Sequence, residues 1–214
     1  GNSIASGGNY NVTIGDEAGT AITTGDNNVA VGYAALDANT TGTQNVAVGS
    51  DSLGANTTGP NNVAVGYLAL SANTTGNGST AIGSDALKAN TTGTGNTAIG
   101  SAITAVRNAA MAANTTGYWN VAMGGGAFTA NTTGHSSVAI GFGSLGANTT
   151  AANSVAVGAY SLDANTTGAS NTALGYAALS TNTTANNNTA VGLNALLAVT
   201  TGSQNTALGT YAGS

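Results

Sequence analysis

The five residues Asn45-Val46-Ala47-Val48-Gly49 decide how this chain folds, because variants of them occur twelve times in its 214 residues. Each copy begins 17 residues after the one before it, except that 24 residues separate Asn96 from Asn120. Self-similarity at a fixed period is typical of repeat architectures, so one short unit must account for the whole chain. The copies begin at Asn11, Asn28, Asn45, Asn62, Ser79, Asn96, Asn120, Ser137, Ser154, Asn171, Asn188 and Asn205.

The order of residues within this phrase predicts a short β-strand. The first residue after Asn or Ser is Val in seven copies and Thr in five, and the third is Ile, Val, Leu or Met in all twelve. These two positions share one face of an extended strand, which we assign to the interior of a coil. The middle residue, Ala in eleven copies, then lies on the opposite face, where its small size indicates close packing. Gly ends every copy, as expected where φ is positive or another backbone approaches closely.

A 17-residue unit cannot bury its apolar face alone, so the units must stack. Stacking at about 4.8 Å per coil pairs the strands in register and places Asn above Asn, which allows ladders of side-chain amides. The six residues between Gly49 and the next Asn, Asn56, are too few for a stable helix. We therefore predict an all-β fold, a parallel β-solenoid of about twelve 17-residue coils. It would form a single repeat domain with regular coils over 1–100, an insertion at 101–113 and regular coils over 114–214.

The composition excludes several classes of function. Charged residues are 4% of the chain, against about 25% in ordinary soluble domains, and its two cations cannot form a nucleic-acid surface. A single histidine, His135, and no cysteine exclude multi-His and thiolate metal sites, and we interpret His135 as a surface variant. No apolar run approaches the roughly 18 residues that span a bilayer. We expect no enzyme activity, no cofactor, no metal, no nucleic-acid partner and no membrane insertion.

The repeated motif Asn/Ser-Val/Thr-Ala-Val/Ile-Gly resembles the head repeats of trimeric autotransporter adhesins of the YadA type. The longer unit, with its Asn-Thr-Thr-Gly, is similar to relatives found in phage tail-fibre proteins, although the bacterial heads do not share its 17-residue period. The resemblance covers nearly the whole chain. It implies a left-handed β-roll, three chains packed side by side as a homotrimer, and cell attachment from an extracellular location on a cell surface or virion.

Three groups of residues are candidates for contact with a partner. The middle Ala residues are candidates for the interface of a homo-oligomer, which would be a trimer or an end-to-end polymer. Arg107 in the insertion, with Tyr118 and Trp119 after it, is the candidate surface contact for a host-surface receptor or glycan. The recurring Thr pairs would resemble the ice-binding solenoids if they stack on a flat face. The interface candidates are Ala47, Ala64, Ala81, Ala98, Ala122 and Ala139, and the Thr ladder comprises Thr40, Thr41, Thr57, Thr58, Thr74, Thr75, Thr91 and Thr92.

Three functions therefore stay open at this point. We favour a structural and adhesive fibre segment that attaches to a host or cell surface. A self-assembling extracellular filament and an ice-binding solenoid are the alternatives. Nine Asn residues that precede a Thr pair, Asn39 among them, also match the N-glycosylation acceptor, although a ladder of turns explains the same pattern.

Overall fold

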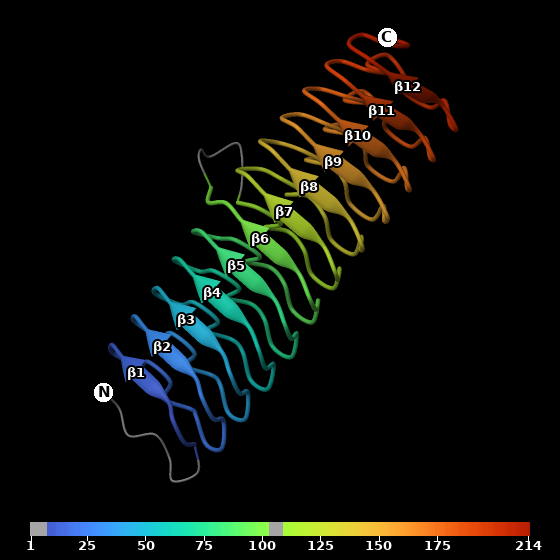
Figure 1. Ribbon diagram of the computed structural model, residues 1–214. Helices are drawn as coiled ribbons and strands as arrows, with labels where there is room; N and C mark the ends of the chain where they lie inside the picture. The colour runs from blue at the N-terminus through green and yellow to red at the C-terminus, as the bar shows by residue number, and fades with distance from the viewer. Residues whose placement is uncertain (1–7, 103–108) are drawn as a thin grey trace.

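The twelve copies form twelve parallel strands of a single sheet, wound as one β-solenoid (Figure 1). The computed structural model describes residues 8–102 and 109–214, and these residues contain no helix. Each strand pairs only with the strands directly before and after it along the chain, which confirms the predicted solenoid. The strands are β1 (Val12–Ile14), β2 (Val29–Val31), β3 (Val46–Val48), β4 (Val63–Val65), β5 (Thr80–Ile82), β6 (Thr97–Ile99), β7 (Val121–Met123), β8 (Val138–Ile140), β9 (Val155–Val157), β10 (Thr172–Leu174), β11 (Thr189–Val191) and β12 (Thr206–Leu208).

Like residues lie beside like along the whole rod, as the period predicts. Val46 pairs with Val63 and Ala47 with Ala64. The register is kept even across the longer interval, where Ala98 of β6 pairs with Ala122 of β7. The seven extra residues fall between β6 and β7 in the sequence, and the regular path is present again where the Ala110 N–H donates to the Gly100 carbonyl at 3.1 Å.

The strand faces are the reverse of our assignment. The middle Ala of strands β2 to β11 is completely buried in the core of its own coil. The flanking Val, Thr, Ile, Leu and Met side chains point outward and stay partly or largely exposed. Buried Leu residues such as Leu53 fill the interior from the turn that follows each strand. The coil is so narrow that a strand facing this Leu row has room only for a methyl group, which explains the uniform Ala.

The turn that carries the buried Leu uses an uncommon backbone. In the third coil, Asp51 and Leu53 have φ values of 55° and 50°. A left-handed conformation costs a non-glycine residue about 1–2 kcal/mol, so it must be offset by neighbouring contacts. Here the Leu53 N–H donates to the Ala69 carbonyl of the next coil at 3.0 Å, and its side chain is fully buried. The sequence reading did not anticipate Leu in this conformation.

Two rows of buried Asn side chains link the coils. At the start of each strand, Asn28 Oδ1 accepts a hydrogen bond from the backbone N–H of Asn45 at 2.9 Å. A second row precedes the Thr pairs and forms the amide-to-amide ladder, as where Asn56 Nδ2 donates to Asn39 Oδ1 at 2.9 Å. Because these Asn side chains have no access to water, the hydrogen bonds between coils are what satisfies them.

The second row is interrupted once. Asn148 turns its amide to its own turn, where its Oδ1 accepts from the Ala151 N–H at 2.9 Å, and Asn131 Oδ1 is left buried without a partner. Ala151 stands where most coils have Gly, yet Asn182 beside the equivalent Ala185 still donates to Asn165 at 2.9 Å. Replacement of Gly by Ala is therefore not sufficient to break the ladder.

We expect Asn73→Ala to destabilise the chain more than Asn148→Ala, by about 1–2 kcal/mol. Both side chains are fully buried at the same repeat position. Asn73 donates to Asn56 Oδ1 and accepts from Asn90 Nδ2, so its removal takes one hydrogen-bond partner from each of these two buried amides, whereas Asn148 bonds only within its own turn. Urea unfolding of the two variants measures the difference, and equal losses would show that the ladder bonds contribute nothing beyond burial.

Candidate functional site

The outward-pointing strand residues form a continuous surface of Val, Ile, Leu, Met and Thr side chains, mostly apolar, which we call the outer sheet face. It consists of the first and third residues of the twelve strands, none of which is charged. Every third-position side chain within the rod is at least partly exposed, up to 39% at Ile82 and 38% at Met123. Figure 1 shows the strands aligned side by side along the rod, so this face extends over its whole length.

The Ala residues that we expected at a chain-to-chain interface cannot serve there. Each has no exposed surface and packs inside its own coil, because the inward face of a narrow solenoid accepts only small side chains. These Ala residues do pack closely, as their small size indicated, but they pack against the opposite wall of their own coil and not against another chain. The corrected residues are Ala47, Ala64, Ala81, Ala98, Ala122 and Ala139.

Tyr118 and Trp119 lie together on the surface at the corner that precedes β7. Their rings meet edge to face, 5.1 Å between centroids and 86° between planes. His135, which follows Tyr118 by one 17-residue period, stacks on the Tyr118 ring at 4.6 Å and 5°. The sequence reading treated His135 as an isolated surface variant, although the repeat period itself puts it one coil above Tyr118. We call Tyr118, Trp119 and His135 the aromatic cluster.

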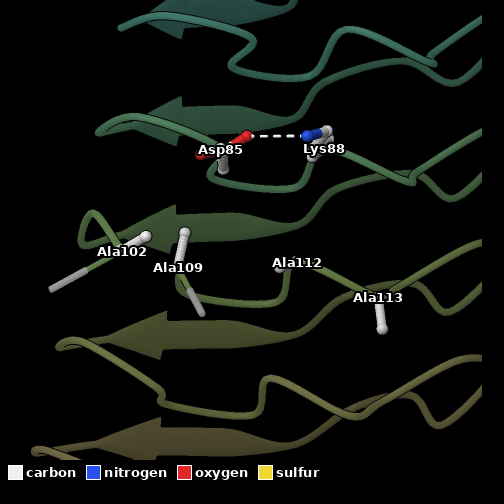
Figure 2. A pocket seen from close by; sticks show the side chains of 6 residues that line it. All are labelled: Asp85, Lys88, Ala102, Ala109, Ala112 and Ala113. Atoms are coloured by element: carbon white, nitrogen blue, oxygen red, sulfur yellow. Dashed lines mark ion pairs between the residues drawn. The ribbon is translucent and has the colours of Figure 1, made fainter. Parts of the chain in front are cut away.

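The third member of our predicted contact, Arg107, lies outside the described residues. The flanks of the insertion, Ala102 and Ala109, are at the corner after β6, whereas Tyr118 and Trp119 precede β7. Figure 2 shows a shallow hollow at this flank, lined by Ala side chains and by Asp85 and Lys88. The Lys88 ammonium pairs with the Asp85 carboxylate at 3.0 Å.

The Thr pairs lie in bends and not in strands. The first Thr of a pair uses its hydroxyl within the fold, as where Thr40 Oγ1 donates to the Thr57 carbonyl at 3.0 Å. The second Thr, for example Thr41 or Thr92, is exposed. Each regular coil thus presents one exposed Thr from the pair, and these residues form a single row along the rod. Ice binding stays a prediction, and it would depend on this row of Thr residues.

A second group of aromatic and acidic side chains lies at the corner that follows the strands. Phe142, Tyr160 and Tyr176 from successive coils form edge-to-face pairs, with centroids 5.5 and 6.0 Å apart. A hydrogen bond to the Glu17 carboxylate raises the pKa of Tyr33, and the negative charge of Glu17 adds to the shift. Burial raises the pKa of Asp37, with smaller contributions from nearby carboxylates. Negative charge is therefore concentrated at this corner in the first coils.

The Asn residues of the glycosylation motif are inaccessible. All nine have no exposed surface, and their amides are directed into the coil. A modifying enzyme could not reach them in the folded rod, so the pattern reflects the ladder of turns. They are Asn39, Asn56, Asn73, Asn90, Asn114, Asn131, Asn148, Asn165 and Asn182.

Within 8–102 and 109–214, no group of three or more His, Asp or Glu residues is placed to hold a metal ion. No helix in these ranges is long and apolar enough to cross a membrane. The fold defines the chain as a parallel β-solenoid repeat protein. Comparison with family models, curated proteins and solved structures finds no match. The outer sheet face and the aromatic cluster are therefore the candidates from which a function must be argued.

Proposed function

We propose that this chain is a structural and adhesive fibre segment, a homotrimer in which the outer sheet faces of three rods pack together, and that it serves in attachment to a host or cell surface. The observation that carries the proposal is the uncharged and mostly apolar face that runs along all twelve strands. The resemblance of the repeats to the heads of trimeric adhesins supports three chains and an extracellular location.

The size of the outer sheet face favours a partner over solvent. Twelve strands at about 4.8 Å and three residues at about 3.3 Å give roughly 55 Å by 10 Å, on the order of 500 Å² in plan. A mostly apolar patch of this size is often a functional contact surface, because its exposure costs free energy. Val, Ile, Leu and Met at the third position would gain most from being covered.

A second copy of the chain fits this face better than an unrelated surface. The side chains recur at the strand spacing of about 4.8 Å, so only a partner with the same period meets equivalent contacts at every coil. Identical rods satisfy that condition by construction, and closed symmetry limits the assembly to a fixed number. The absence of charge on this face also removes the like-charge repulsion that would oppose such packing.

The mass in solution tests the proposal. We expect about 61 kDa, three times the 20.2 kDa chain, by light scattering after size exclusion. Ile82→Lys combined with Ile140→Lys places charges on the outer sheet face and should give monomers that keep their β-sheet circular dichroism. The control, Thr58→Lys with Thr133→Lys, changes exposed residues in the bends and should remain trimeric.

Other masses would contradict the trimer. A wild-type mass of one or two chains rejects the three-rod assembly. A mass that grows continuously with concentration would instead favour the self-assembling filament. Trimers that survive both Lys substitutions would show that the outer sheet face is not the interface.

A further inference from the structure

Trp119 is an unusually exposed side chain for its size. Two thirds of its surface, 66%, is in contact with solvent, although Trp is normally among the most buried residues. Its neighbour Tyr118 is 36% exposed. The single Trp of the chain, left in water beside a Tyr, indicates a contact site, because Trp and Tyr are the residues that most often anchor binding.

The fold holds this indole in one place. The backbone N–H of Trp119 donates to the Thr94 carbonyl of the preceding coil at 3.0 Å, and Trp119 occupies a left-handed position with φ of 55°. The ring lies over Gly95, where an added Cβ would come within 2.6 Å of the indole Cδ1. Tyr118 then stands at right angles to it, supported by the stacked imidazole of His135. Rings that are fixed before binding lose little entropy when a ligand arrives.

The scarcity of positive charge on this chain restricts the charge of a ligand that the aromatic cluster could bind. Lys88 and Arg107 are the only cations of the chain, and Lys88 is paired with Asp85. Single-stranded nucleic acid also stacks on aromatic rings, but it needs a cationic groove along its phosphates. A sulfated or phosphorylated polymer has the same requirement. These surroundings therefore disfavour an anionic ligand.

We propose that the aromatic cluster binds a neutral sugar of a glycan. The C–H groups on one side of a pyranose ring are weakly electropositive and complement the electron-rich face of an indole or phenol ring. The hydroxyls of such a sugar need neutral partners that both donate and accept. The Tyr118 hydroxyl, the His135 imidazole and the Ser136 hydroxyl, which lies 3.2 Å from His135 Nδ1, supply such groups at the edge of the cluster.

This inference names the ligand class for the attachment proposed above and rests on that proposal. In a trimer, each rod would carry one aromatic cluster. Three weak sugar contacts on one rigid shaft would act together on a glycan-coated surface, which raises the overall avidity without any new contact. A modest affinity for a single sugar is therefore compatible with firm attachment.

Trp119 is the only tryptophan in the chain, so its fluorescence reports directly on the cluster. The full chain is titrated with lactose, maltotriose, mannotriose and triacetylchitotriose, and with a heparin hexasaccharide as an anionic probe. We expect a saturable change in emission with at least one neutral sugar and none with heparin. No response to any neutral sugar, or a response to heparin alone, would overturn the inference.

Variants then locate the site by calorimetry with the sugar that responds. Trp119→Ala, and Gly95→Asn, which pushes the indole aside, should each weaken binding about tenfold or more, equivalent to about 1.4 kcal/mol. Tyr176→Ala removes an exposed aromatic from the opposite corner and should leave binding unchanged. Binding that survives Trp119→Ala would place the sugar elsewhere. Solution mass on the same samples separates the two proposals, because trimers that bind no sugar reject only this inference and monomers that bind sugar reject only the trimer.

Discussion

Gly66→Val should unfold the coil that contains it and lower the stability of the chain by about 4 kcal/mol or more. Gly66 has a φ of 135°, a region that residues with a side chain avoid. A Cβ added there would lie 2.6 Å from the carbonyl carbon of Gly83 in the next coil. That atom belongs to the stacked backbone and cannot move without breaking the coil above. Thermal unfolding followed by far-ultraviolet circular dichroism measures the loss.

Gly78→Asn is the matched control for this prediction. Gly78 also has a positive φ, 63°, but an added Cβ there would meet nothing within 4 Å. Asn61 occupies the equivalent place in the preceding coil with a φ of 60°. We expect Gly78→Asn to change the stability by less than about 0.5 kcal/mol. A small loss for Gly66→Val as well would mean that the coils are not stacked as closely as the structure shows.

The repeat period was sufficient to predict the solenoid, the parallel register and the positive φ of the Gly at each strand end. A fixed 17-residue step leaves few other ways to bury the apolar positions, so Val46 had to lie beside Val63. Gly49, with a φ of 134°, represents the position that only Gly fills in all twelve copies. These features follow from spacing and from backbone geometry alone.

The direction of the strand faces could not be predicted in the same way. Val-Ala-Val is apolar on both sides, so the rule that apolar residues point inward does not distinguish Val46 from Ala47. The choice depends on the width of the interior, which the opposite wall sets through the buried Leu53 and its φ of 50°. No feature of the local sequence predicts that Leu53 adopts this left-handed conformation. Our assignment of the larger Val side chains, and not the Ala, to the interior of the coil was therefore wrong.

The candidate site was only partly visible in the sequence. Tyr118 and Trp119 are adjacent in the chain and stood out as aromatic residues in a sequence with few of them. His135 joins them because it lies one period further on, and Gly95 makes room for the indole. Such contacts between coils require the register, which is known only once the fold is known. The outer sheet face was missed because its residues were assigned to the interior.

Ala98→Leu should destabilise the chain by about 3 kcal/mol, because three carbon atoms must enter an interior that is already filled. Ala98 has no exposed surface and belongs to the core. Had its face pointed outward, the same substitution would be accepted with little loss. The substitution therefore tests the corrected orientation of the strands. Urea unfolding in the Ile82→Lys, Ile140→Lys background keeps assembly out of the measurement.

Ile99→Phe adds the same number of carbon atoms one residue later, on the outer sheet face. Ile99 is partly exposed, so the larger ring can extend into solvent and the stability should change by less than about 1 kcal/mol. The two variants alter adjacent residues of β6 and differ only in the direction of the side chain. Equal losses, or a greater loss for Ile99→Phe, would contradict the inward position of Ala. The outer sheet face, and the trimer built on it, would then lose their basis, because both depend on where Val, Ile and Leu point.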